Sequence, residues 1–401
     1  MKILIIHNHY GGHSGETSVM EKHQAILEKN GHQVRCYTRS STEIKTMQFG
    51  AARAFFTALY NPRSIREVRR ILHEYSPDIV HVHNLYPLIS PSVLSCIKAS
   101  GIPIVMTVHN YRLVCPNGLF FNKYGICERC AGGREWYCVR FNCEESLPKS
   151  LGYAIRNAWA RVAQHYSYNI DAFLCLTGFQ KNKLVNNGIP PHKCHILPNF
   201  AEIEPDEDHC PEAHHDCGGF LFIGRLNRQK GIDVIVESAN LSPEASFRFA
   251  GSVDASFIDI RALPSNAQWL GAVDDEQRRL QLLKSRALVF ASRSYEGFPM
   301  VFLEAMQHGL PVIAPRLAGY PEIVREGVNG WLFTPGDADG LAHIVRKIQG
   351  DPDQASMYGR NGREILLKEY SGEVWYREYM NIVSTLLKGK KMITRDAGGE
   401  V

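Results

Sequence analysis

Residues 3–16 read Ile-Leu-Ile-Ile-His-Asn-His-Tyr-Gly-Gly-His-Ser-Gly-Glu. A short apolar run followed by a glycine pair and a helical pattern is typical of a buried strand that turns into a helix. Gly11 and Gly12 let the backbone approach a ligand closely, and the N-terminus of the following helix favours anions. A tight turn without a ligand is the alternative. The stretch lacks the G-x-G-x-x-G dinucleotide pattern, so a hydride-transfer enzyme is disfavoured.

The same alternation of short apolar runs and helical patterns continues through the chain and predicts an α/β protein with two Rossmann-like, doubly wound domains facing a cleft. An N-terminal domain is expected over 1–197 and a C-terminal domain over 220–373. A linker rich in Pro, acidic residues and His is expected over 198–219. An apolar-periodic helix over 374–388 is expected to pack back, and 389–401 to be disordered. The predicted strands are 3–8, 33–38, 79–84, 103–109, 172–177, 220–224, 247–251, 268–270, 287–292 and 311–314.

Composition bounds the class of protein. A chain of 401 residues with 44% hydrophobic and 21% charged residues is globular and long enough for two or three domains. Its apolar runs are too short to span a membrane, and its start does not resemble a signal peptide, so a cytoplasmic protein is expected.

Charge is distributed unevenly along the chain. Residues 1–200 carry 23 Lys and Arg against 12 Asp and Glu, whereas the rest carry 22 against 29. A basic N-terminal half suits phosphates, anionic lipid or acidic glycans, and an ordinary solvated surface is the alternative. The basic residues are scattered, which disfavours a nucleic-acid binder.

A basic loop follows the first strand of the second domain, with the sequence Gly-Arg-Leu-Asn-Arg-Gln-Lys-Gly over 224–231. Arg225 offers a planar fork and Lys230 a point charge, a combination that suits a pyrophosphate. The alternative is a solvated basic loop. Its place between a strand and a helix favours the phosphate.

A second loop, over 292–306, reads Ser-Arg-Ser-Tyr-Glu-Gly-Phe-Pro-Met-Val-Phe-Leu-Glu-Ala-Met. Pro299 suits the first turn of a helix and leaves the next N–H groups available to an anion. A carboxylate accepts two hydroxyl hydrogen bonds, so Glu296 and Glu304 each suit a vicinal diol, one of a ribose and one of a sugar ring. The pair could instead be the acid and base of a glycosidase, but the basic loop favours a phosphate-bearing ligand.

Histidines stand at the ends of two predicted strands of the first domain, at His81, His83 and His109. A histidine at a strand end can reach a ligand, although a lone one is more often a hydrogen-bonded neighbour. His109 is the better candidate. No nucleophile elbow accompanies these residues, which disfavours a hydrolase.

In order along the chain, Gly11-Gly12, His109, Arg225 with Lys230, Glu296 to Glu304 as E-x7-E, and Gly-Tyr-Pro-Glu at 319–322 resemble retaining glycosyltransferases of family four. The resemblance covers the chain from Met1 to about Leu387 and is most specific over 224–333. It implies the GT-B fold, with the acceptor held mainly by the N-terminal domain and a nucleotide-sugar by the C-terminal one. It also implies that no catalytic metal takes part.

The resemblance assigns roles to particular residues. Glu304 is expected to bind ribose and Glu296 the transferred sugar, with His109 near that sugar. Arg225 and Lys230 are expected to clamp the diphosphate. Because the family is described by front-face retention, the leaving phosphate helps to deprotonate the acceptor, and no protein general base is expected. The other expected substrate contacts are Gly11, Gly12, Phe298, Met300, Val301 and Gly319.

A cysteine-rich insertion over 115–143 departs from the plain family pattern. Its spacing is C-x11-C-x2-C-x7-C-x4-C, and four thiolates can close a tetrahedral structural zinc site. The expected ligands are Cys115, Cys127, Cys130 and Cys143, with Cys138 interchangeable with Cys143. Free thiols or a local disulfide are the alternatives. Such a site would organise a loop and shape the acceptor pocket.

Two weaker features complete the prediction. Aromatic residues in 51–60, followed by four arginines, suit an interfacial membrane segment, whereas a core helix beside a solvated one is the alternative. Metal binding in the linker is disfavoured. The arginines are Arg63, Arg66, Arg69 and Arg70, and the linker residues are His209, Cys210, His214, His215 and Cys217.

The sequence therefore predicts a cytoplasmic or peripherally membrane-bound retaining glycosyltransferase. It is expected to move a hexose or N-acetylhexosamine from a nucleotide diphosphate sugar, most often UDP-linked in this family, to a glycan or lipid-linked acceptor in surface polysaccharide assembly. The alternatives are a sugar-nucleotide epimerase or phosphorylase on the same fold, and a catalytically silent binding or scaffold protein. The base, the sugar and the acceptor stay open.

Overall fold

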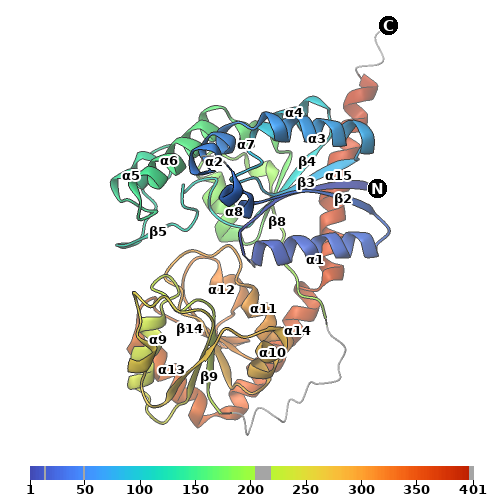
Figure 1. Cartoon of the computed structure of the whole chain (residues 1–401). Coiled ribbons are helices and arrows are strands. Elements are labelled where there is room, and N and C mark those ends of the chain that lie inside the picture. The colour runs from blue at the N-terminus through green and yellow to red at the C-terminus, as the bar shows by residue number, and fades with distance from the viewer. Residues whose placement is uncertain (13–14, 48–49, 204–217, 397–401) are drawn as a thin grey trace. The chain divides into compact units, whose positions relative to one another are not determined.

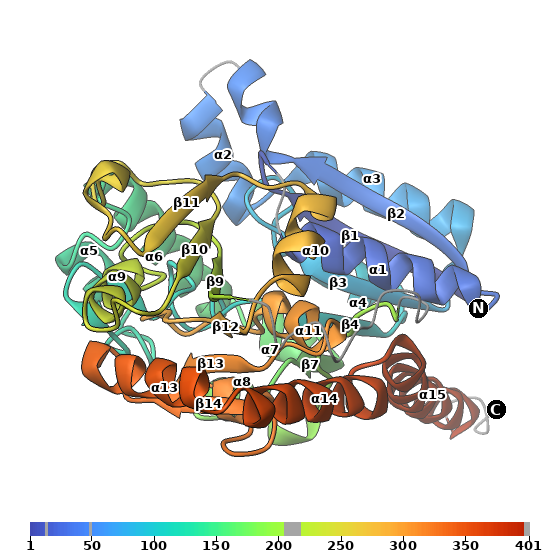
Figure 2. The same ribbon diagram turned by 90° about the horizontal axis from the view of Figure 1, so that it is seen from below.

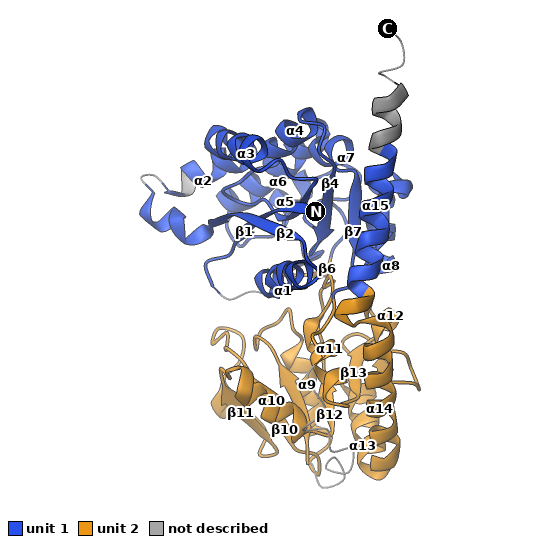
Figure 3. Cartoon of the chain, turned by 90° about the vertical axis from the view of Figure 1, so that its right-hand side faces the viewer, with its two compact units in different colours: residues 1–122, 127–199, 375–401 blue, residues 123–126, 200–374 orange. Residues whose placement is uncertain are grey.

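A computed structural model describes residues 1–12, 15–47, 50–203 and 218–396 (Figure 1). The chain divides into two compact units (Figure 3). Unit 1 consists of 1–122, 127–199 and 375–401, and unit 2 of 123–126 and 200–374. The metal-binding group considered in the linker lies outside the described residues.

Unit 1 is built on a six-stranded parallel sheet with the order β2-β1-β3-β4-β7-β8. In β1 the apolar run packs completely, since Ile3, Leu4, Ile5 and Ile6 are fully buried. The strands are β1 (Lys2–His9), β2 (Gln33–Ser40), β3 (Ile79–Asn84), β4 (Ile104–Val108), β7 (Ala172–Cys175) and β8 (Cys194–Ile196).

Helices surround this sheet. The helical pattern of 151–168 predicts one helix, but the structure has two, α6 and α7, because Gln164 adopts a left-handed conformation with φ 51°. A small hairpin of β5 (Phe121–Asn122) and β6 (Gly125–Ile126) lies in the cysteine-rich insertion. The helices are α1 (Gly15–Lys29), η1 (Ser41–Thr46), α2 (Gly50–Leu59), α3 (Pro62–Tyr75), α4 (Ser92–Ala99), α5 (Trp136–Arg140), α6 (Leu147–Val162), α7 (His165–Asn169), α8 (Gly178–Val185) and η2 (Pro191–Lys193).

Unit 2 repeats the architecture with the parallel strand order β11-β10-β9-β12-β13-β14. Figure 2 shows α13 and α14 running beside β13 and β14. The strands are β9 (Phe220–Ile223), β10 (Phe247–Ala250), β11 (Ala267–Gly271), β12 (Ala287–Val289), β13 (Val312–Pro315) and β14 (Gly330–Phe333). The helices are α9 (Ile232–Asn240), η4 (Ile260–Ala262), α10 (Asp275–Leu283), α11 (Met300–Gln307), α12 (Tyr320–Ile323), α13 (Ala338–Gly350) and α14 (Pro352–Glu369).

The last helix, α15 (Gly372–Asp396), is longer than the sequence predicts. The predicted disorder is wrong for 389–396, because the helix continues through them, while 397–401 lie outside the described residues. From Trp375 onward the helix belongs to unit 1. Its buried Trp375 and Tyr379 pack on His23 and His81. Within the described part of the chain, no helix is long and apolar enough to cross a bilayer.

Candidate functional site

The basic loop of unit 2 connects β9 to α9 and is held tightly against its neighbours. Gly231 adopts φ 67°, and a Cβ there would lie 2.1 Å from the carbonyl oxygen of Ala291. A Cβ at Gly251 would lie 2.0 Å from the carbonyl oxygen of Gly224. Both positions therefore require glycine, and the loop is fixed against the ends of neighbouring strands.

Lys230 and Glu296 meet across the two loops that the sequence singles out. Lys230 Nζ lies 2.7 Å from Glu296 Oε1, and only 20% and 18% of the two side chains are exposed. Asn227 Oδ1 accepts a hydrogen bond from the backbone N–H of Lys230. Arg225 stands on the same loop with an exposed side chain. The expected diphosphate ligand Lys230 and the expected sugar ligand Glu296 are thus adjacent.

The loop that carries Glu296 is braced from both sides. The Tyr320 hydroxyl donates to the carbonyl oxygen of Ser294 at 2.6 Å and accepts from the backbone N–H of Glu296 at 3.2 Å. Gln229 Nε2 donates to Ser294 Oγ at 2.9 Å. Sequence reasoning missed the positioning roles of Tyr320 and Gln229. Tyr320 stands inside the quoted motif, where it directly follows Gly319, but its partner cannot be read from that motif.

The helix α11 begins at Met300, directly after Pro299, so its first turn carries the positive end of the helix dipole. Val301 stands in this turn, and Phe298 is buried just before it. On the same helix, Glu304 Oε2 lies 3.5 Å from Arg278 Nε of α10. This arginine was not anticipated, because it comes from another helix.

Unit 2 therefore carries three cationic side chains, Arg225, Lys230 and Arg278, a helix N-terminus and two carboxylates. Cations and helix N-termini bind phosphate oxygens, whereas carboxylates accept from hydroxyl pairs. The set is chemically suited to a nucleotide diphosphate that carries a sugar.

In unit 1, His109 directly follows β4 and belongs to a buried group of imidazoles. His109 Nε2 lies 2.8 Å from His83 Nδ1, and the two rings stack with their centroids 5.1 Å apart. His81 Nε2 lies 2.8 Å from Thr107 Oγ1. Burial lowers the pKa of His109 and of His83. Both are therefore neutral at neutral pH and act through hydrogen bonds.

The glycine pair lies next to a polar cluster of unit 1. Asn110 Nδ2 donates to Glu16 Oε1 at 2.6 Å, and Arg112 Nη1 donates to the hydroxyl of Tyr10 at 2.5 Å. A Cβ at Gly12 would meet nothing within 4 Å, and at Gly11 only the Thr42 methyl group at 3.7 Å. Neither glycine has a positive φ. Packing within the protein thus does not require glycine at these two positions. Close approach of a ligand to the backbone would explain both glycines.

A pocket beside His109 shares lining residues with a second cavity. The first is lined by His109, Asn110 and His83, and the second is a cavity of about 240 Å³. Tyr86, Arg112, Leu113 and Tyr166 line both pockets. The second is also lined by Gly132 and Gly133 of the cysteine-rich insertion and by Asn157, Ala160 and Arg161 of α6.

The cysteines of the insertion gather only in part. Cys130 and Cys138 are buried in one cluster, with Cys143 packed against it, whereas Cys127 is half-buried outside that cluster. The buried Cys115 thiol donates to an asparagine oxygen. Within the described residues, no three of these sulfur atoms lie within 4.8 Å of one another. The zinc ligand set therefore stays a prediction.

Sequence reasoning missed a group of three histidines that could hold a metal ion. His23, His81 and His83 place ring nitrogens within 4.8 Å of one another and are all buried. His23 stands on α1, far from the strand histidines in sequence, so only the packing of α1 on the sheet reveals the group.

Comparisons with known proteins agree with this arrangement. The profile of "Glycosyltransferase Family 4" matches residues 15–204, and that of "Glycosyl transferases group 1" matches residues 214–365. The chain is 25% identical to the amylovoran biosynthesis glycosyltransferase AmsK of Erwinia amylovora, over 54% of this chain and 56% of that protein. The match thus spans about half the length of that relative.

Solved structures share the fold. Sucrose-phosphate synthase of Thermosynechococcus elongatus superimposes with a TM-score of 0.70 at 17% identity, covering 97% of this chain and 99% of the other. Anabaena HepE, solved in complex with UDP, superimposes with a TM-score of 0.65 at 15% identity, covering 96% and 100%. The two sheets with their helices are therefore those of a GT-B glycosyltransferase.

The two profiles follow one another along the chain, and the residues of the E-x7-E segment lie where the second one matches. The protein belongs to the group 1, family 4 glycosyltransferases.

Proposed function

We propose that the protein is a retaining glycosyltransferase that uses a UDP-sugar as donor and a glycan or lipid-linked acceptor. The observation that carries the proposal is the contact of Lys230 with Glu296, 2.7 Å apart and mostly buried in unit 2. A cation for a phosphate and a carboxylate for a sugar hydroxyl pair stand side by side there, as transfer from a diphosphate sugar requires.

In this proposal, unit 2 stabilises the departure of the nucleotide. Breaking the anomeric bond builds negative charge on the leaving phosphate, so Arg225, Lys230 and the N-terminus of α11 stabilise the transition state more than the ground state. Glu304 accepts the ribose hydroxyls, and Arg278 at 3.5 Å orients its carboxylate. Glu296 accepts hydroxyls of the transferred sugar.

Unit 1 takes the acceptor. The pockets beside His109 are lined by polar groups such as Asn110, Arg112 and Asn157, which suit hydroxyl-rich ligands. A neutral His109 hydrogen-bonds to the transferred sugar, and its contact with His83 fixes its orientation. The leaving phosphate takes the proton of the acceptor hydroxyl, so no protein general base is needed.

Known relatives support the donor and the setting. Anabaena HepE was solved with UDP-glucose, and AmsK is named for the biosynthesis of amylovoran. By analogy we place this protein in surface polysaccharide assembly, with UDP as the first nucleotide to test.

The first experiment is a thermal-shift titration with UDP, GDP, ADP and their sugar conjugates, because a ligand that binds only the native state raises its melting temperature. We expect UDP to stabilise the wild type and not Arg225→Ala or Glu304→Gln. The control is Arg261→Ala, which changes an exposed arginine of the same unit. If no nucleotide stabilises the wild type, the scaffold alternative replaces the transferase.

A second experiment separates transfer from epimerisation. The donor that stabilises the wild type is incubated with candidate acceptors, and the products are analysed by mass spectrometry and NMR. A new glycosidic bond with the donor's anomeric configuration supports the proposal. An epimerised donor with no new bond contradicts it.

A further inference from the structure

The helix α6 exposes the kind of face that an ordinary surface helix buries. Its buried face carries small and polar residues, whereas its large apolar residues are exposed. The exposed residues recur at intervals of three and four positions, so they form one continuous stripe. The buried residues are Ser150, Ala154, Arg156, Asn157 and Ala160. The stripe consists of Leu147, Leu151, Ile155, Trp159 and Val162, between 41% and 69% exposed.

The polar face of α6 has specific partners that fix the rotation of the helix. Arg156 lies over the ring of Tyr86 at 4.2 Å and donates to the carbonyl oxygen of Pro116. Asn157 donates to the carbonyl oxygen of Arg112 at 2.5 Å. Turning the stripe inward would break these buried hydrogen bonds, so the exposure of the apolar face is built into the unit.

The neighbouring helix α2 extends the apolar surface. α2 packs on α6 (Figure 1), where a Cβ at Gly152 would lie 3.2 Å from the ring of Phe55. On the outside of α2, Phe56 is 66% exposed and the following Tyr60 is 59% exposed.

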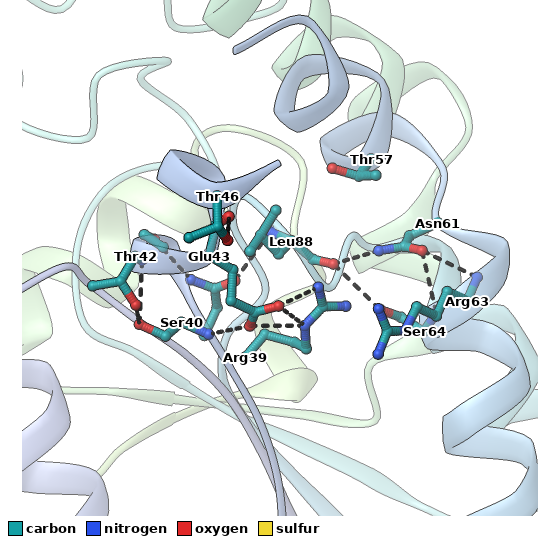
Figure 4. Close-up of polar contacts among 12 residues, drawn as sticks. Arg39, Ser40, Thr42, Glu43, Thr46, Thr57, Asn61, Arg63, Ser64 and Leu88 are labelled. Atoms are coloured by element: carbon teal, nitrogen blue, oxygen red, sulfur yellow. Dashed lines mark hydrogen bonds and ion pairs between the residues drawn. The ribbon is translucent and has the colours of Figure 1, made fainter. Parts of the chain in front are cut away.

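The link between α2 and α3 is anchored to the loop that follows β3 (Figure 4). Asn61 caps α3 through Arg63 and Ser64, and both its amide and the Ser64 hydroxyl donate to the carbonyl oxygen of Leu88. These hydrogen bonds fix the position of the chain just after Phe56 and Tyr60.

Basic residues stand on the helices of this surface and on the next helix along the chain. Residues 50–70 contain five arginines and one glutamate, and four of the arginines lie on α3, where Arg63 and Arg70 pair with Glu67 and Glu74. Arg53 of α2 and Lys149 of α6 are exposed on the two helices that carry the apolar residues. An apolar stripe with aromatic residues and basic neighbours is the pattern of a helix that lies in a membrane interface and is attracted by anionic lipid.

We propose that α6 and α2 dock unit 1 onto an anionic lipid bilayer, with the stripe of α6 inserted among the lipids. The sequence pointed to 51–60 with the four arginines that follow it, and not to α6. In the structure, Ala54 and Ala58 of that segment are buried, and α6 supplies most of the apolar surface. The stripe was missed because a helical period in 151–168 does not show which face is covered.

The position of the surface also bears on the acceptor, and this step rests on the proposed function. Asn157, Ala160 and Arg161 of α6 line the cavity that shares lining residues with the His109 pocket. A helix with one face in the bilayer and another on this cavity suits an acceptor carried on a lipid.

The test is flotation of the full chain with vesicles of phosphatidylcholine, alone or mixed with phosphatidylglycerol. We expect the wild type to float with the mixed vesicles and much less with phosphatidylcholine alone. The double variant Leu151→Glu with Ile155→Glu should lose at least about ten-fold in partitioning, since two apolar contacts are replaced by charges. The control is Met357→Glu with Leu367→Glu, two residues of α14 that are equally exposed at 44% each.

Three results would overturn the proposal. The first is a wild type that stays unbound with the mixed vesicles, and the second is a double variant that floats as well as the wild type. The third is a wild-type dimer in sedimentation velocity that Leu151→Glu with Ile155→Glu converts to a monomer, since the stripe would then be a self-association surface. The UDP-induced thermal shift is measured on the same variants, so a failure of membrane docking is distinguished from a failure of the proposed transferase.

Discussion

Acidification should destabilise unit 1 through its buried imidazoles. Burial lowers the pKa of His7 and of His81 to about 3, and both side chains are fully buried. An unfolded imidazole has a pKa of about 6.5. The unfolded chain therefore binds more protons below that pH, so the stabilisation is complete above about pH 6.5 and is lost as the pH falls toward 3.

The magnitude follows from the two pKa values. At about pH 5, each imidazole that stays neutral in the folded state lowers the free energy of unfolding by about 2 kcal/mol, so the pair lowers it by about 4 kcal/mol. The whole free energy of unfolding of a domain is only about 5–15 kcal/mol. The neighbours of His81 are His23, His83, Thr107 and Tyr379, among which there is no carboxylate to stabilise a charged imidazole.

The assay is hydrogen–deuterium exchange of peptides that cover β3, read by mass spectrometry between about pH 7 and pH 5 and corrected for intrinsic exchange rates. The opening free energy of the wild type should fall by at least about 4 kcal/mol. In His81→Asn the opening free energy should fall by about 2 kcal/mol less over the same pH range. The exposed control His192→Asn should show the same fall as the wild type. A wild type whose opening free energy stays constant over this range would refute the reasoning.

Three further predictions concern other parts of the molecule. Gly231→Ala should lower the free energy of unfolding, measured by urea denaturation, by at least about 2 kcal/mol, because the new Cβ meets a backbone oxygen. The control Gly309→Ala has a similar positive φ but open space around the Cβ, so it should lower the free energy of unfolding by only about 1 kcal/mol. Equal losses in the two variants would contradict the packing argument. If His109 contacts the transferred sugar as proposed, His109→Ala should lower kcat by about 10²-fold and leave the UDP-induced thermal shift unchanged; a lost thermal shift would place it in the nucleotide site. If the insertion holds structural zinc, elemental analysis of the purified protein should find one zinc per chain that Cys130→Ser removes and Cys36→Ser keeps; a zinc-free wild type would leave reduced thiols.

Local sequence carried enough information for most strands of both sheets. A buried parallel strand reads as a continuous apolar run, as in 3–6 of β1 and in β9, and needs no partner to be recognised. The strand β8 was missed because its three residues include a histidine and are only partly buried, and β14 because it begins with Gly330. The helix α14 was missed because its sequence is polar and contains glycines. One of these, Gly359, is required by packing, since a Cβ there would lie 1.8 Å from the carbonyl oxygen of Gly309.

The sequence by itself determined the fold class and the residue types of the donor site, because strand–loop–helix order and the spacing of Glu296 and Glu304 are local properties of the chain. Only the tertiary structure decided which groups meet. Lys230 contacts Glu296 across 66 positions of sequence, and His23 joins the strand histidines through the packing of α1. It also decided that the apolar face of α6 is the exposed one. Periodicity in the sequence defines two faces of a helix but not which one is covered, whereas the buried contacts of Arg156 fix the polar face of α6 against the rest of unit 1.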